Sequence, residues 1–319
     1  MKPGVFIVAF LYFVSSAALL VLNKIAISII PNASILLLIQ VASTVLILSV
    51  ASIIVRGDKF RVNFRPTAQY IKSYTSVAAV FLTTIYSNFR LIHAAGVNPF
   101  IVLRCTTPLL VSLLDWFYLG RALPRGRPLL ALLGIFGSGT AYALTKLPES
   151  HLLDNFSMQG CMWSFAWLVS FSLDMVYIKH VVDKYECTGM ERTLYQNALA
   201  LPFLTFVLVS PLESHGAVRS VTKATFPALI SLLLSCVAGT VLSFTGMTLR
   251  SELSATLFTV LGILCKMASC LLNELFVERE KNPWSLAFIF SAILCSASYR
   301  PAPLRRSADE VAARIEVSS

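Results

Sequence analysis

Long stretches that are apolar on every side constrain this chain more than any other feature of its sequence. A helix needs about 20 residues to cross the roughly 30 Å hydrocarbon core of a bilayer. A helix on a soluble core would instead carry its apolar residues on one face only. The stretches therefore predict transmembrane helices. The ten predicted helices span residues 5–30, 34–55, 73–93, 98–119, 129–147, 159–180, 194–212, 227–249, 254–276 and 283–299.

The composition agrees with an all-α integral membrane protein, since 56% of the 319 residues are hydrophobic and only 13% are charged. No linker interrupts residues 1–300, which we expect to form a single transmembrane domain. The polar, proline-containing tail at 301–319 is predicted to be disordered. A cleaved N-terminal signal peptide is disfavoured, because the apolar run continues past Ser15–Ala17 to Ile30.

The basic residues of the predicted loops are distributed unevenly between the two sides of the membrane. With a cytosolic N-terminus, sixteen fall on the cytosolic side and four on the other. This bias predicts that both termini are cytosolic. On the lumenal side, Asn32 and Asn155 then each begin an N-x-S/T glycosylation motif. Glycosylation of Asn32 is disfavoured, and glycosylation of Asn155 is left open.

Cations outnumber acidic residues inside the predicted helices. An Arg or Lys at bilayer depth costs roughly 2.5 to 3.5 kcal/mol, so such residues persist mainly where they face a bundle interior or a watery cavity. The acidic residues of the spans are Asp115, Asp174 and Glu274. The surplus positive charge predicts an anionic ligand. The six cations within or near the ends of spans are Lys24, Arg90, Arg104, Lys146, Lys179 and Lys266.

These cations differ in depth, and depth ranks them as candidate ligand contacts. Arg104 and Lys266 lie deepest in their spans, and Lys24 and Arg90 are secondary candidates. Lys146 and Lys179 lie near span ends, where long side chains can reach the head groups. Asp115 and Glu274 have two open interpretations, as salt-bridge partners or as proton carriers.

An offset of 158 residues aligns the chain with itself and indicates an internal repeat. Residues 86–121 then match residues 244–279 without a gap, with seven identities. Because each half holds five predicted spans, the two repeats, about 5–147 and about 159–299, would insert in opposite orientations. Inverted repeats are a transporter architecture with a site near the midplane. Arg104 and Lys266 then lie in the repeat-related fourth and ninth spans.

Motifs for direct ATP use and for catalysis are missing from the sequence. There is no G-x-x-x-x-G-K-[ST] phosphate loop, no G-x-S-x-G and no H-E-x-x-H. Because these motifs are missing, we expect no enzyme activity and no cofactor. The seven cysteines include no Cys-x-x-Cys pair, so we expect no metal site. An intramembrane lipid-modifying enzyme is a disfavoured alternative, with Glu149 and Asp154 as its candidate carboxylates. No nucleic-acid partner is expected.

Three segments resemble the nucleotide-sugar transporters of the drug/metabolite transporter superfamily, which are relatives of the triose-phosphate translocators. They are Tyr177–Val182, Leu194–Asn197 and Ser254–Lys266, and they are similar to Golgi GDP-sugar transporters of fungi, plants and algae. The resemblance runs from about Val5 to Tyr299. Leu194–Asn197 matches the family's F-Y-N-N motif, and Gly262–Lys266 matches its G-A-L-N-K motif.

The resemblance implies roles for the residues of both motifs, because both line the central cavity in the family. Tyr195, Gln196 and Asn197 would contact the base or the sugar, and Gly262 and Lys266 the sugar-phosphate. Gln196 replaces one Asn of the first motif, and Cys265 replaces the Asn of the second, which leaves the identity of base and sugar open.

Arg104 falls where the translocators carry a phosphate-facing lysine. Its forked guanidinium suits a diphosphate, since it can bind two oxygens at once.

Together these features predict an antiporter of the Golgi membrane that exchanges a GDP-mannose or GDP-fucose type of nucleotide sugar for GMP. The alternative functions are a UDP-sugar transporter and a triose-phosphate or phosphoenolpyruvate translocator. The alternative locations are the endoplasmic reticulum and the plastid envelope. Exchange is favoured because an empty cavity would leave Arg104 and Lys266 without an anion. A homodimer stays open.

Overall fold

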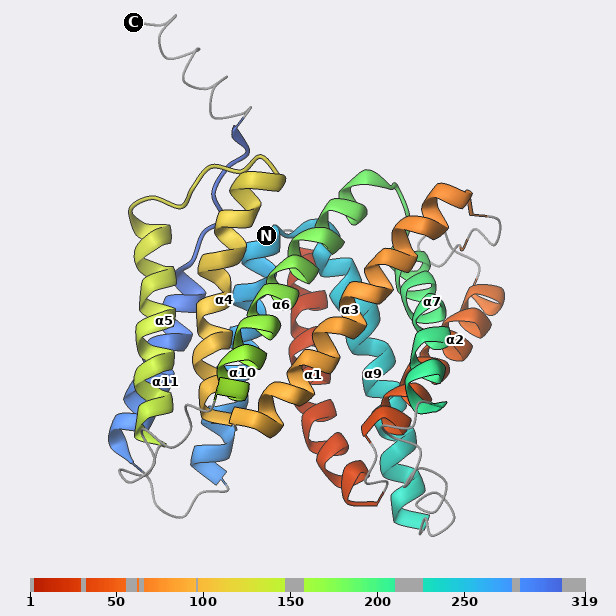
Figure 1. Ribbon diagram of the computed structural model, residues 1–319, viewed down its shortest axis with the longest axis horizontal. Helices are drawn as coiled ribbons and strands as arrows, with labels where there is room; N and C mark the ends of the chain where they lie inside the picture. The colour runs from red at the N-terminus through yellow and green to blue at the C-terminus, as the bar shows by residue number, and fades with distance from the viewer. Residues whose placement is uncertain are drawn as a thin grey trace, which may run out of the picture. The chain divides into compact units, whose positions relative to one another are not determined.

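The computed structural model describes residues 3–29, 33–55, 62, 66–95, 97–146, 158–209, 226–276 and 282–305, which form ten helices and no strand (Figure 1). Each helix coincides with one of the ten predicted spans. The helices are α1 (Pro3–Ile29), α2 (Ala33–Ile54), α3 (Ala68–Ala95), α4 (Val97–Tyr118), α5 (Arg127–Thr145), α6 (Met158–Lys184), α7 (Gly189–Val209), α9 (Phe226–Glu252), α10 (Ala255–Phe276) and α11 (Pro283–Ser298).

Seven of these helices are long and apolar enough to cross a membrane, and α11 is a shorter apolar helix. An all-α membrane protein is therefore confirmed, whereas the inverted relation of the two halves stays a prediction. Helices suit this setting because they satisfy every backbone polar group within the segment.

Capping residues extend or end the helices beyond the apolar runs. Helix α7 begins five residues before the predicted Leu194, because the Thr188 hydroxyl accepts a hydrogen bond from the Glu191 amide at 3.1 Å. Asn282 caps α11 in the same way, accepting from the Trp284 amide at 3.0 Å, with Pro283 in the first turn.

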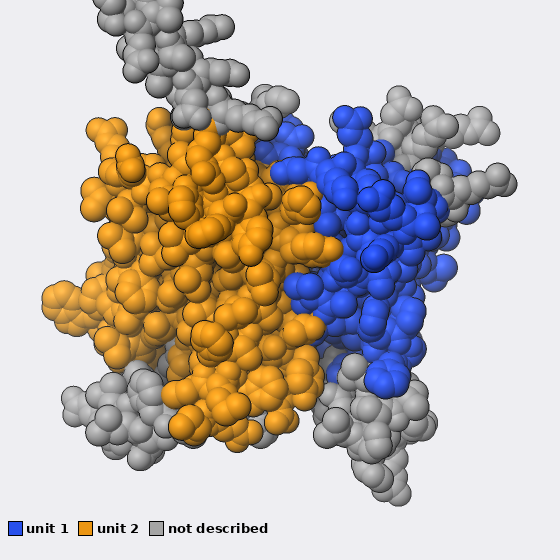
Figure 2. Space-filling view, turned by 45° about the horizontal axis from the view of Figure 1, so that its top comes forward, with its two compact units in different colours: residues 1–82, 181–252 blue, residues 83–180, 253–319 orange. Residues whose placement is uncertain are grey.

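The chain divides into two compact units, coloured separately in Figure 2. Unit 1 comprises residues 1–82 and 181–252, and unit 2 comprises residues 83–180 and 253–319. Each unit combines segments from the two halves of the sequence.

Unit 1 contains α1, α2, α7 and α9. Helix α9 packs against the other three, and α2 also packs against α7. Buried polar side chains link these helices: the Gln40 amide donates to Asn23 at 2.7 Å and to Ser235 at 3.2 Å, and Thr44 and Thr240 share a hydrogen bond at 3.1 Å. Such hydrogen bonds between helices are common where no water is available.

Unit 2 contains α4, α5, α10 and α11, with α5 packed on α4 and α11, and α10 packed on α4 and α11. Its core includes Cys105, Leu132, Ile263 and Met267. Gly139 lets α5 approach α4 closely, because a Cβ atom there would collide with the Cys105 side chain.

The first residues of the C-terminal tail, up to residue 305, make backbone hydrogen bonds, and the predicted disorder of residues 301–319 stays a prediction. The Arg305 amide donates to the Gly120 carbonyl and the Ala122 amide to the Pro303 carbonyl, both at 2.9 Å. The Arg121 guanidinium also donates to the Ala302 carbonyl. Residues 306–319 lie outside the described part.

Candidate functional site

The structure brings Arg104, Gly262 and Lys266 together in unit 2. Arg104 on α4 reaches across to α10, where a Cβ atom on Gly262 would lie 3.6 Å from the Arg104 Nη2 atom. Lys266 follows Gly262 by four residues and so lies on the same face of α10. Arg104 lies near enough for its positive charge to act on Lys266. Both side chains are half-buried.

The Lys266 ammonium makes no hydrogen bond or ion pair with any residue that the structure describes. Two like charges repel each other, and the repulsion is stronger where water is scarce. An anion between the two groups would remove this repulsion. The Arg104–Gly262–Lys266 cluster is therefore suited to bind an anion.

An aromatic row on α6 supports the Arg104 side chain. The Arg104 guanidinium lies 4.8 Å from the ring centroid of Phe171, and Phe171 stacks on Trp167 at 5.1 Å. Trp167 in turn meets the edge of Phe100, one turn before Arg104 on α4, at 5.0 Å. These contacts fix the direction of the guanidinium through cation–π attraction. This row was not predicted from the sequence, although the four-residue spacing of Trp163, Trp167 and Phe171 could have indicated it.

Arg90 occupies a different part of the same row. Its guanidinium lies 5.1 Å from the ring of Trp163, which is eight residues before Phe171 on α6. At 1.5 Å per residue these two aromatic positions are roughly 12 Å apart along the helix. Arg90 therefore does not share the aromatic contact of Arg104. Its side chain is exposed on α3. The side chain of Lys24 lies outside the described part.

An ion pair lies further along the same face of α10. Lys266, Cys270 and Glu274 follow one another at intervals of four residues, and the Lys146 Nζ atom lies 2.6 Å from the Glu274 Oε1 atom. Glu274 is fully buried and Lys146 is 24% exposed. The salt-bridge interpretation of Glu274 is confirmed, and the prediction that Lys146 extends to the head groups is wrong. This pairing neutralises the carboxylate nearest to Lys266 along the face.

Asp115 has a structural role that neither open interpretation described. Its Oδ2 atom accepts hydrogen bonds from both the amide and the hydroxyl of Thr256, at the first turn of α10. The carboxylate therefore caps the N-terminus of that helix. Lys179, predicted to reach the head groups, is instead buried at 6% exposure, and its charge acts on Asp115.

The other predicted motif lies on α7 in unit 1. The Asn197 amide donates to the Thr193 carbonyl at 2.8 Å and to the Ser243 hydroxyl at 3.0 Å. Tyr195 packs its ring against the edge of Tyr70, with the centroids 5.1 Å apart. The Gln196 amide makes no hydrogen bond within the described ranges. Asn197 thus has its donors occupied, and Gln196 keeps both its donor and its acceptor available.

The chain has homologues with named functions, although no family model matches it. It is 29% identical over 295 residues to "GDP-fucose transporter 1" of Arabidopsis thaliana, a match that covers 91% of this chain and 83% of the relative. The chain is a homologue of the nucleotide-sugar transporters of the drug/metabolite transporter superfamily. The predicted resemblance is confirmed.

Further relatives have related names. The "GDP-mannose transporter GONST3" of Arabidopsis thaliana is 29% identical over 66% of this chain and 55% of its own length. The "GDP-mannose transporter" of Eremothecium gossypii is 21% identical over 77% of each chain. A solved crystal structure matches 93% of this chain and 96% of its own with a TM-score of 0.65, and at 13% identity this shows a shared fold alone.

Proposed function

We propose that this protein is a GDP-sugar transporter of the Golgi membrane that exchanges a GDP-mannose or GDP-fucose type of sugar nucleotide for GMP. The observation that carries the proposal is the Arg104–Gly262–Lys266 cluster, in a homologue of transporters whose names specify GDP-sugars. A nucleotide sugar brings two phosphate charges, and the cluster offers two cations.

The two cations would bind the diphosphate in different ways. The planar guanidinium of Arg104 can donate to two phosphate oxygens at once, whereas Lys266 supplies a compact charge with three rotatable donors. Phe171 holds the Arg104 guanidinium in place. Gly262 leaves room beside Nη2, because no side chain occupies that position.

We assign recognition of the base to the α7 motif by its resemblance to the family. Gln196 can both donate and accept hydrogen bonds, as the edge of guanine does. Tyr195 adds an aromatic ring, and Asn197 retains its carbonyl oxygen as an acceptor. This combination favours a base with both donors and acceptors on one edge.

Exchange follows from the cost of the empty cluster. Without an anion, two neighbouring half-buried cations repel each other, and any state that buries them further is raised in free energy. Bound GMP or GDP-sugar removes this penalty, so the loaded protein changes conformation more readily than the empty one.

Liposomes that contain the purified protein test the proposal. They are loaded with GMP, UMP, CMP or buffer alone, and uptake of labelled GDP-mannose, GDP-fucose and UDP-sugars is followed. We expect GDP-sugar uptake that depends on internal GMP. Preference for UMP would assign the protein to UDP-sugars, and uptake of triose phosphate against inorganic phosphate would make it a phosphate translocator.

A further inference from the structure

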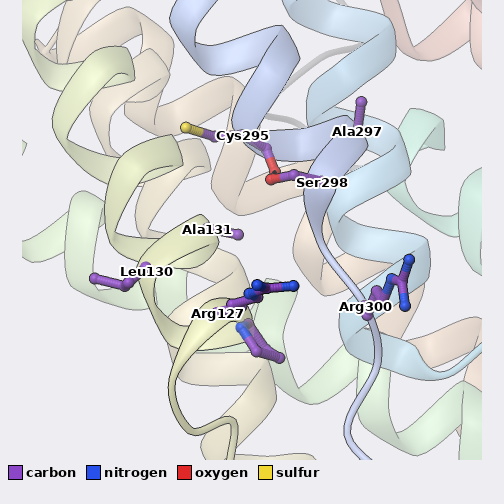
Figure 3. Close-up of a pocket in the computed structure, with 8 residues that line it drawn as sticks. Arg127, Leu130, Ala131, Cys295, Ala297, Ser298 and Arg300 are labelled. Carbon is purple, nitrogen blue, oxygen red and sulfur yellow. Dashed lines mark hydrogen bonds between the residues drawn. The ribbon is translucent and has the colours of Figure 1, made fainter.

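A groove of about 640 Å³ lies between the start of α5 and the end of α11 in unit 2 (Figure 3). Leu130 and Ala131 line it from α5, and Cys295 and Ala297 line it from α11. The helices approach each other closely one turn further along α5, where a Cβ atom on Gly134 would lie 2.5 Å from the Cys295 sulfur. This contact closes the groove at its apolar end.

Two arginines lie at the other end of the groove. Arg127 is the first residue of α5, and Arg300 follows the end of α11 by two residues. Figure 3 shows them on opposite sides of the groove, with Cys295 at its far end. Both arginines are exposed, and neither makes a hydrogen bond or an ion pair within the described part of the chain.

The depth of these residues in a bilayer determines what can enter the groove. The arginines lie at helix ends, where we expect the head groups, and the apolar lining extends one turn toward the expected hydrocarbon core. Leu130, which lines the groove, and Leu294, next to a lining residue on α11, are 67% and 69% exposed, as expected for side chains that face lipid. A ligand that fits must therefore be anionic at one end and apolar at the other.

We propose that this groove binds an anionic phospholipid, with the phosphate between Arg127 and Arg300 and the upper part of an acyl chain along Ala131 and Ala297. Guanidinium groups bind phosphate oxygens in pairs, which suits a head group held from two sides. Basic pockets between transmembrane helices on the cytosolic side bind anionic head groups, and the basic-residue bias predicts that this end is cytosolic. This site is independent of the cluster at Lys266.

Native mass spectrometry of the full-length protein tests the site. The protein is mixed with equimolar phosphatidylinositol and phosphatidylcholine and transferred into the mass spectrometer. The lipid that stays bound to the protein is identified by its mass. We expect retention of phosphatidylinositol. Arg127→Gln and Arg300→Gln should each weaken the preference about fivefold, and the double variant roughly 25-fold. Arg125→Gln, an exposed arginine two residues away that does not line the groove, is the matched control and should leave it unchanged.

A second variant tests the apolar half of the site. Ala297→Leu fills the groove without changing its charge and should lower retention of phosphatidylinositol at least about threefold. The proposal is overturned if the arginine double variant keeps the wild-type preference, or if Arg125→Gln loses it equally. It is also overturned if a second copy of the chain covers this face, which would be seen as a dimer that retains no phospholipid.

Discussion

Lys146→Ala removes the partner of a fully buried carboxylate, and the structure predicts the cost. The Lys146 Nζ and Glu274 Oε1 atoms are 2.6 Å apart, and the Glu274 side chain has no exposure through which water could replace the lost ammonium. Removing one partner of a buried ion pair typically costs about 3 to 5 kcal/mol. Because Lys146 itself is 24% exposed, we expect the lower end, about 3 kcal/mol.

The thermal midpoint of the detergent-solubilised protein measures this cost. A loss of about 3 kcal/mol should lower Tm by roughly 5 °C or more. Glu274→Gln should cost less, since the partly exposed Lys146 can extend toward water. The double variant Lys146→Ala/Glu274→Gln should be more stable than Lys146→Ala alone, because it leaves no unpaired buried charge.

Lys72→Ala is the matched control for this double-mutant cycle. Lys72 is exposed on α3 and should change stability by no more than about 0.5 kcal/mol. A Lys146→Ala protein with wild-type Tm would refute the reasoning, as would additive effects of the two substitutions.

Three further predictions concern the cluster and the helix contacts. Lys266→Ala should reduce GDP-sugar exchange at least about tenfold with little loss of Tm. Lys266→Arg should keep the charge yet transport poorly. Normal exchange by a stable Lys266→Ala protein would contradict the proposed site. Asn197→Ala should raise KM and weaken discrimination between GMP and UMP, through lost hydrogen bonds worth about 1 to 3 kcal/mol; unchanged competition would make α7 a packing element. Gly139→Ala should lower Tm by forcing Cys105 aside at a cost of about 1 to 3 kcal/mol. Gly262→Ala should be as stable as the wild type, because its Cβ atom would lie 3.6 Å from the Arg104 Nη2 atom.

The positions of the helices could be predicted from the sequence because a bilayer imposes a simple rule. An apolar run of about 20 residues forms a helix irrespective of its neighbours. The predicted ends differ from the observed ones by several residues at α6 and α7, since hydropathy locates the apolar part and not the caps. Only contacts such as that between Thr188 and Glu191 determine where a helix begins.

The partners of charged side chains could not be predicted, because they depend on which helices pack together. Lys146 and Glu274 are far apart in the sequence, and nothing in their local context indicates that α5 places one beside the other. Depth in the span ranked Lys266 as a candidate ligand contact, and that role stays a prediction; within the described residues it has no ionic partner. The aromatic contact of Arg104 with Phe171 required the packing of α4 on α6 in the same way.

Coupled exchange is tested most directly by following both ligands in the same liposomes. Labelled GDP-sugar outside and a differently labelled GMP inside are counted together over the first seconds after mixing. We predict that one GMP leaves for each GDP-sugar that enters, and that both fluxes fall together in Lys266→Ala. Entry of GDP-sugar with no matching GMP efflux would contradict the exchange mechanism.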